Sequence, residues 1–125
     1  MLSATGDAIV SADSLLLTVA GLPLSNQLPT FFQGTTVPNA GTGAAFGDGL
    51  RCAGGTTIRL GTRTATNGTA SFGFGIAGDL PVSVKGLVPA LGATRTYQVI
   101  YRNVQAFCTS ALFNLSNGLT VLWAP

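Results

Sequence analysis

Residues that form turns interrupt this chain about every ten residues, and this spacing limits the fold more than any other feature of the sequence. Between them lie short runs in which apolar and polar residues alternate, as in β-strands. No segment is rich in strong helix formers, whereas the chain holds 17 Gly and many Thr, Ser and Val. Eight or nine short strands at this spacing predict an all-β fold, a two-layer antiparallel β-sandwich of jelly-roll or immunoglobulin-like topology. No break in composition divides residues 1–125, so we expect a single domain.

Individual strands and turns can be predicted from the same pattern. The predicted strands are residues 2–10, 14–20, 30–36, 50–53, 56–64, 69–76, 94–102, 111–115 and 119–123, with a further period-two run at Val82, Val84 and Leu87. Asn67-Gly68 and Asn117-Gly118 predict hairpin turns, because both positions of a type I′ turn need a positive φ. Gly34 predicts a bulge or a close backbone approach. Residues 37–49 predict a long loop without strands.

Charged residues are unusually scarce, which excludes several classes of function. They make up 8% of the chain, against about 25% in an ordinary globular protein, and the net charge is +2. The four carboxylates are all Asp, and the six cations are scattered along the chain. Nucleic-acid binding needs clustered phosphate contacts, so we expect no nucleic-acid partner. No apolar run is long enough to span a bilayer.

The chain contains no His, and this argues against catalysis. Most nucleophilic triads need an imidazole as general base. The acidic residues Asp7, Asp48 and Asp79 lie beside Gly and are explained as turn formers. No spaced set of acidic ligands indicates a metal site. We therefore expect a protein that is not an enzyme and has neither cofactor nor metal.

The two cysteines, Cys52 and Cys108, predict a disulfide. The alternative is a pair of buried free thiols that pack as small hydrophobic groups. A bridge would close nearly half the chain and contribute on the order of 4 kcal/mol in the chain-entropy model. It would also indicate an oxidising, extracellular compartment.

Aromatic and polar residues on the predicted strands form a weak candidate ligand site. β-Sandwiches hold sugars on exposed aromatic rings beside polar side chains, and buried phenols need hydrogen-bond partners. The alternation of 94–102 places Tyr97, Val99 and Tyr101 on one face and Gln98, Ile100 and Arg102 on the other. The candidate ligand-binding residues are Gln33, Tyr97, Gln98, Tyr101, Arg102 and Trp123. Trp123 also fits a core position in its alternating strand.

The scarcity of charge bears on assembly as well. Sheet proteins protect their strand edges with charged residues, above all Lys, and this chain has one Lys. A short, weakly anchored strand at residues 2–10 could add to the sheet of a neighbour. Strand edges therefore predict a homo-oligomer or filament, whereas a compact monomer with a neutral surface is the alternative.

Several segments resemble a family of uncharacterised C-terminal modules of secreted proteins from planctomycetes and myxobacteria. The resemblance is carried by residues 2–6, 17–23 and 31–34, by 49–55 with Arg59-Leu60, and by 97–102 and 113–119. The chain departs from the family pattern at Ile100, often aromatic there, and at Asn103, where an Asp tends to follow the Arg. The resemblance implies an extracellular, β-rich accessory domain without known activity, and it supplies no catalytic residues.

Taken together, these observations predict a secreted or cell-surface protein that binds or builds rather than catalyses. The leading hypothesis is a structural or interaction module that can self-assemble into a surface array or filament. The alternative is an accessory module of a secreted enzyme that binds a carbohydrate or another surface, with a polysaccharide as its partner.

Overall fold

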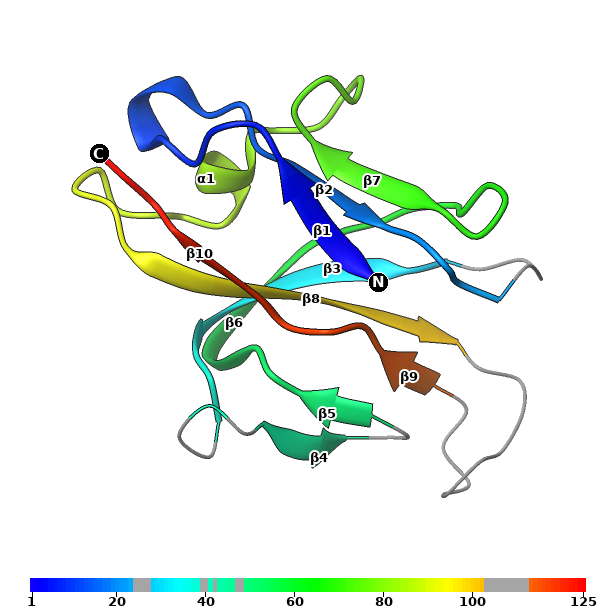
Figure 1. Cartoon of the computed structure of the whole chain (residues 1–125). Helices are drawn as coiled ribbons and strands as arrows, with labels where there is room; N and C mark the ends of the chain where they lie inside the picture. Colours follow the sequence, from blue (N-terminus) through cyan, green and yellow to red (C-terminus); the bar gives the residue numbers. More distant parts are fainter. Residues whose placement is uncertain (24–27, 39–40, 42, 47–48, 103–112) are drawn as a thin grey trace.

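The computed structural model describes residues 1–23, 28–38, 41, 43–46, 49–102 and 113–125, and its regular secondary structure is almost entirely antiparallel strands (Figure 1). One sheet has three strands in the order β1-β2-β7, and a second has five, in the order β10-β8-β3-β6 with β9 also on β8. The strands of these sheets are β1 (Leu2–Thr5), β2 (Leu16–Val19), β7 (Ala70–Gly73), β3 (Thr30–Thr36), β6 (Gly54–Thr62), β8 (Thr94–Arg102), β9 (Phe113–Leu115) and β10 (Leu119–Leu122). A hairpin of β4 (Ala44–Phe46) and β5 (Gly49–Arg51), the 3-10 helix η1 (Val10–Ala12) and the helix α1 (Val82–Lys85) complete the fold.

The two larger sheets pack face to face around one hydrophobic core, which confirms the predicted β-sandwich. The first two strands pair in one sheet, the chain crosses to the other for β3 and β6, and it returns for β7 before β8 and β10 complete the second sheet. This order is that of an immunoglobulin-like sandwich in which β6 pairs with β3 rather than with β7. The described part of the chain contains no helix that is long and apolar enough to cross a bilayer.

Strand alternation sets the two faces of the five-stranded sheet, as predicted for 30–36 and 94–102. Phe31 of β3 and Val99 of β8 point into the core, with 1% and 0% of their surfaces exposed. The neighbouring Phe32 and Ile100 therefore lie on the outer face. The close approach predicted at Gly34 is also confirmed, since a Cβ there would lie 2.5 Å from the backbone of Gly54.

Val82–Lys85 form a helix, and Gly86 and Leu87 a turn, rather than the predicted strand. Pro81 precedes α1, and Gly86 ends it. Asp13, from the other end of the chain, accepts a hydrogen bond of 2.8 Å from the backbone N–H of Ser83 and so satisfies a free donor of the first turn. Val82 is buried whereas Val84 is exposed, as expected when residues two apart lie on opposite sides of a helix.

The Asn67-Gly68 dipeptide forms the predicted turn but not a hairpin between two sheet neighbours. Asn67 and Gly68 both have a positive φ, and Thr66 and Thr69 exchange hydrogen bonds across the turn. The flanking strands β6 and β7 nevertheless lie in different sheets. The turn therefore connects the two layers of the sandwich.

The prediction of a hairpin at Asn117-Gly118 is wrong. Both β9 and β10 pair with β8, and their registers differ by one residue, so the two segments form one edge strand with a bulge between them. Asn117 instead bonds to β1: its Oδ1 accepts from the Leu2 N–H at 2.7 Å, and its Nδ2 donates to the Leu2 carbonyl at 3.0 Å. With Leu2 only 1% exposed, β1 is firmly held within its own fold, contrary to the weak anchoring expected.

Candidate functional site

Three of the predicted ligand-binding residues form a hydrogen-bonded chain inside the core. The Trp123 indole N–H donates to the Tyr97 hydroxyl at 2.8 Å, which donates to the Gln33 Oε1 at 3.0 Å, and the Gln33 Nε2 donates to the Gly86 carbonyl at 2.8 Å. Their exposed fractions are 2%, 0% and 1% for Trp123, Tyr97 and Gln33. We call these three residues the core network. Because their polar atoms bond to one another away from solvent, the structure corrects their assignment to a ligand site.

Gln98 lies on the opposite face of β8 and is equally inaccessible, so it too is removed from the ligand site. Its Oε1 accepts hydrogen bonds from the Cys52 and Ala53 N–H groups at 2.8 and 3.3 Å. Its Nε2 donates to the carbonyls of Leu50 and Ser116 at 2.6 and 2.7 Å. One buried amide thus fixes the end of the β4–β5 hairpin and the bulge between β9 and β10 against the sheet.

The remaining predicted residues are dispersed rather than gathered in one site. Tyr101 is half-buried against the core, and burial raises the pKa of its phenol. Arg102 is exposed at the end of β8. Cys52 is a half-buried free thiol in the structure, and its predicted partner Cys108 lies outside the described residues.

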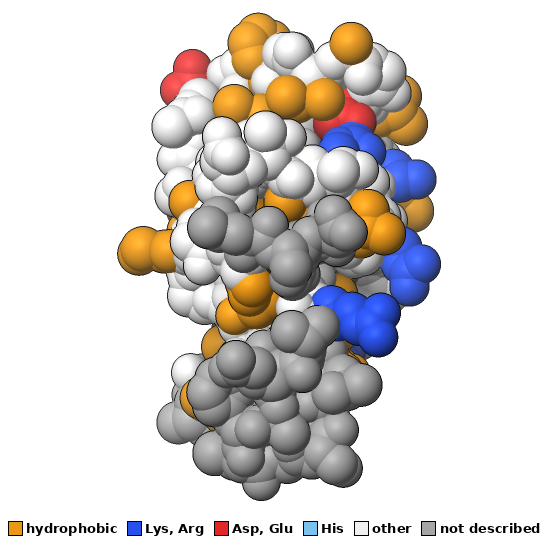
Figure 2. All heavy atoms as spheres, turned by 90° about the vertical axis from the view of Figure 1, so that its right-hand side faces the viewer, with side chains coloured by type: hydrophobic (Ala, Val, Ile, Leu, Met, Phe, Trp, Pro, Cys, Tyr) orange, Lys and Arg blue, Asp and Glu red, His pale blue; other side chains and the backbone are white. Residues whose placement is uncertain are grey.

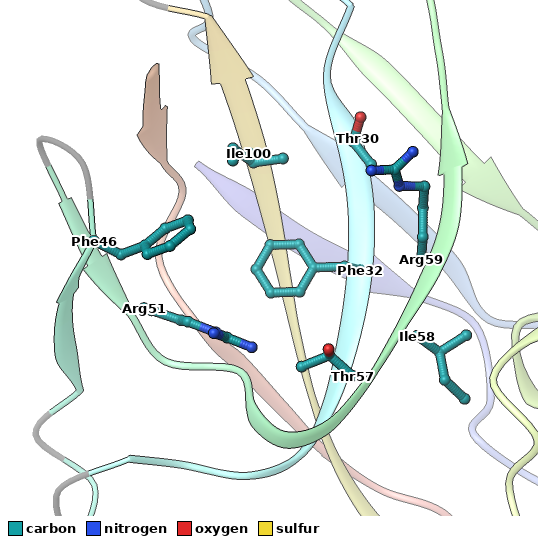
Figure 3. A pocket seen from close by; sticks show the side chains of 8 residues that line it. All are labelled: Thr30, Phe32, Phe46, Arg51, Thr57, Ile58, Arg59 and Ile100. Carbon is teal, nitrogen blue, oxygen red and sulfur yellow. The ribbon is translucent and has the colours of Figure 1, made fainter. Parts of the chain in front are cut away.

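The outer face of the five-stranded sheet carries a groove that the sequence did not predict. Its volume is about 420 Å³, within the range of about 300–1,000 Å³ typical of ligand pockets. The groove is lined by side chains of β3, β6, β8 and the β4–β5 hairpin, namely Thr30, Phe32, Phe46, Arg51, Thr57, Ile58, Arg59 and Ile100. Figure 3 shows the Phe32 ring at its centre, with Arg51 and Phe46 on one side and Arg59 on the other. We call it the outer groove.

The β4–β5 hairpin holds two of these side chains in place. The Arg51 Nε donates to the Ala53 carbonyl at 2.9 Å, and the guanidinium lies 5.7 Å from the centre of the Phe46 ring. The Phe46 ring also contacts that of Phe113 on β9, with the two centres 5.2 Å apart. Phe46 still has 40% of its surface exposed. Arg51 therefore keeps a defined position while its terminal nitrogens remain available to a ligand.

Positive charge dominates the surroundings of the outer groove. Within the part of the chain that the structure describes, its lining contains two guanidinium groups and no carboxylate. Among the described residues the one ion pair joins Arg63 to Asp79, and Arg59 has no partner within hydrogen-bonding distance. Figure 2 shows basic side chains following one another down one side of the molecule. The arrangement favours an anionic ligand that also offers an apolar surface to the rings.

Two of the acidic side chains have structural roles. Asp13 accepts hydrogen bonds from the backbone N–H groups of Leu15 and Ser83, both at 2.8 Å. Asp79 pairs with Arg63 and accepts from the Gly73 N–H at 3.0 Å. Asp48 lies outside the described residues. In the described part of the chain, no three acidic or cysteine side chains come together as metal ligands would.

A signal for the outer groove was present in the sequence but was not used. Two adjacent Phe residues in a strand must place one ring on each face of the sheet, so either Phe31 or Phe32 had to lie outside the core. Arg59 likewise alternates with the buried Leu60. The contribution of Phe46 could not be foreseen, because residues 37–49 were expected to be a loop rather than to contain β4.

Comparisons of the chain with protein-family models, with curated proteins and with solved structures return no match.

Proposed function

We propose that this chain is a non-catalytic interaction module of an extracellular protein and that it binds its ligand in the outer groove. The observation that carries the proposal is the pairing of two aromatic rings with two arginines on an accessible sheet face. Gln33, Tyr97 and Trp123 bond to one another in the core, whereas Arg59 has no hydrogen-bond or ion-pair partner in the described part of the chain. Binding is therefore expected on the outer face, with the core network serving stability.

The extracellular part of the proposal is supported by the cysteines and by the resemblance to modules of secreted proteins. Cys52 directly follows β5, and β5 contacts β9, the strand that Cys108 precedes in the sequence. We propose that Cys52 and Cys108 form a disulfide in the secreted protein. Mass spectrometry of the secreted protein after alkylation without reductant should show no modified thiol, and two labelled cysteines would contradict this part of the proposal.

Binding at the outer groove can be tested with a matched pair of Phe variants. Phe46→Ala removes a ring from the groove, whereas Phe74→Ala removes an exposed ring that does not line it. A panel of soluble polysaccharides and peptides should contain a ligand that shifts the backbone NMR signals of residues 30–32 and 57–59. Phe46→Ala should weaken that binding and Phe74→Ala should not. Failure of the whole panel, or equal loss in both variants, would count against the outer groove.

A second candidate function is self-assembly, favoured by apolar side chains between β7 and β8. Five large ones in this segment are 53% to 87% exposed, namely Phe74, Leu80, Val84, Leu87 and Leu91. Leu87 is 75% exposed and has a φ of +52°, a conformation that costs free energy in a residue other than Gly. Strained backbone conformations concentrate at functional sites, and this one lies among exposed apolar side chains. We propose that copies of this chain can associate there.

Sedimentation velocity distinguishes assembly from the monomeric alternative. Leu87→Gly removes the side chain and relieves the backbone strain, so this variant should fold at least as stably as the wild type but associate less. Lys85→Gln, a change in the preceding turn of α1, is the control. A wild-type chain that stays monomeric at high concentration would refute this second function.

A further inference from the structure

We infer that the ligand of the outer groove is an anionic polysaccharide, whose sugar rings carry carboxylate or sulfate groups. The inference rests on the proposed function and goes beyond it by naming the chemistry of the ligand. It depends on three properties of the groove: its charge, its ring surfaces and the state of its backbone.

The first property is positive charge on both sides of one ring. Arg51 and Arg59 lie on opposite sides of Phe32 (Figure 3). The Nε of Arg51 is fixed by a hydrogen bond, and Arg59 is exposed and has no hydrogen-bond or ion-pair partner among the described residues. A guanidinium bonds to carboxylate or sulfate oxygens through parallel N–H groups. A ligand centred on Phe32 would thus meet a cation on either side, which fits negative charges repeated along a chain.

The second property is the combination of ring surfaces with hydroxyl groups. Phe32 and Phe46 offer apolar surfaces, and the hydroxyls of Thr30 and Thr57 lie in the same lining. Sugar rings have apolar C–H faces and a rim of hydroxyl groups, so they can contact the rings and hydrogen-bond at the edges at once. A small inorganic anion would use the cations alone and leave the ring surfaces uncovered.

The third property concerns β3, the strand at the centre of the outer groove. Its backbone already forms hydrogen bonds with a strand on each side, which argues against a peptide ligand. β3 pairs with β6 on one side and with β8 on the other, and Phe32 has Arg59 and Gln98 as its cross-strand neighbours. An extended peptide is normally recognised through main-chain hydrogen bonds at a free strand edge. At the centre of the outer groove β3 therefore offers side chains only, whereas the free edge of the sheet lies beyond it on β6. A glycan needs nothing else at that centre.

Calorimetric titration of the purified, oxidised chain tests the inference with matched polymers. Dextran sulfate and dextran share one backbone and differ in charge; polygalacturonate supplies carboxylates, and polyglutamate is an acidic chain without sugar rings. Titration in about 0.15 M salt limits long-range attraction. Dextran sulfate and polygalacturonate should both bind, or at least the one whose anion the site prefers. The affinities for dextran and polyglutamate should be at least about tenfold lower.

Two kinds of variant separate recognition in the outer groove from simple attraction. Arg51→Gln and Arg59→Gln should each weaken binding about tenfold, because each removes a charged donor. Lys85→Gln removes the same charge from α1, which does not line the groove, and should leave the affinity unchanged. Phe32→Ala should weaken the binding of the polysaccharide if its rings lie on Phe32. Circular dichroism and thermal unfolding verify that each variant is folded.

Each outcome decides a different claim. Tight binding of dextran together with its loss in Phe46→Ala would overturn the inference and keep the proposed function. Equal binding of polyglutamate, or an unchanged affinity in folded Phe32→Ala, would reduce the interaction to charge and would overturn the inference. Binding of none of these polymers would overturn it as well, and the proposed function would then depend on the broader panel.

Discussion

The inner and outer faces of the five-stranded sheet use the same strands in opposite ways. On β3 and β8 the inward positions include Gln33, which is polar, and Tyr97, whose ring ends in a hydroxyl. The outward positions include the apolar Phe32 and Ile100. Inside, Gln33, Tyr97 and Trp123 satisfy one another. Outside, Phe32 lies in the lining of the outer groove, and Arg59 has no hydrogen-bond or ion-pair partner among the residues that the structure describes.

This difference between the two faces separates stability from recognition. A buried polar chain is stabilising only when its members are paired, so each member of the core network depends on the next. The outer groove has few internal bonds to lose, and its side chains remain available for a ligand. Substitutions inside should therefore change the free energy of unfolding, and those outside should change binding.

The largest expected effect is at Gln98, whose side-chain amide ties the outer face to the end of the hairpin. Gln98→Met keeps the volume but leaves two N–H and two carbonyl groups of the backbone unpaired. We expect a loss of about 3–5 kcal/mol in the free energy of unfolding, measured by urea denaturation. Binding in the outer groove should fall with it, because the hairpin carries Phe46 and Arg51. Unchanged hydrogen exchange at the Cys52 and Ala53 amides would contradict this role.

The next effect is expected in the core network. Tyr97→Phe removes the central hydroxyl and leaves the Trp123 donor and the Gln33 acceptor unpaired, at a cost of about 2–3 kcal/mol. Trp123 is the only tryptophan, so its fluorescence reports the loss of the bond directly. Gly86→Ala is a second way to break the network, since a Cβ there would lie 2.2 Å from the Gln33 Oε1. Both variants should keep their affinity for the ligand once folded.

A smaller effect is expected from alkaline pH, and it acts on the inner face. Burial raises the pKa of Tyr97 well above its ordinary value of 10.0, so the phenol stays neutral in the folded state. In the unfolded chain the Tyr97 phenol ionises at about pH 10. Above that pH the unfolded state binds fewer protons than the folded state, so the free energy of unfolding falls as the pH rises further. The urea concentration at the denaturation midpoint, measured between about pH 8 and 11, should fall less steeply with pH in Tyr97→Phe than in the wild type. Parallel curves for both proteins would contradict the assignment.

The smallest effect on stability is expected at Arg59 on the outer face. Arg59→Gln should change the free energy of unfolding by no more than about 0.5 kcal/mol, because the side chain is exposed and has no partner. Urea denaturation of Arg59→Gln and the wild type measures this difference in the free energy of unfolding. A loss as large as that of Tyr97→Phe would show that the two faces do not divide stability and recognition.

The strand pattern and the face of each residue in β3 and β8 could be predicted from local sequence. Period-two alternation specifies which side chains share a face, and Gly34 marks a close backbone contact. The same reasoning failed at Val82 and Val84, where Asp13 stabilises a helical turn from a distant part of the chain. It failed again at Asn117, whose side chain bonds to Leu2.

The sequence by itself determined an all-β chain with very little charge and no imidazole, because composition and alternation are local properties. Only the tertiary structure decided which face of the sheet became the core. That choice buried Gln33, Tyr97 and Trp123, which were expected to bind a ligand, and left Phe32 and Arg59 outside. Pairing between sheets and the docking of the β4–β5 hairpin depend on contacts between residues far apart in the chain. Alternation divides residues between two faces, but long-range packing selects the face that meets solvent.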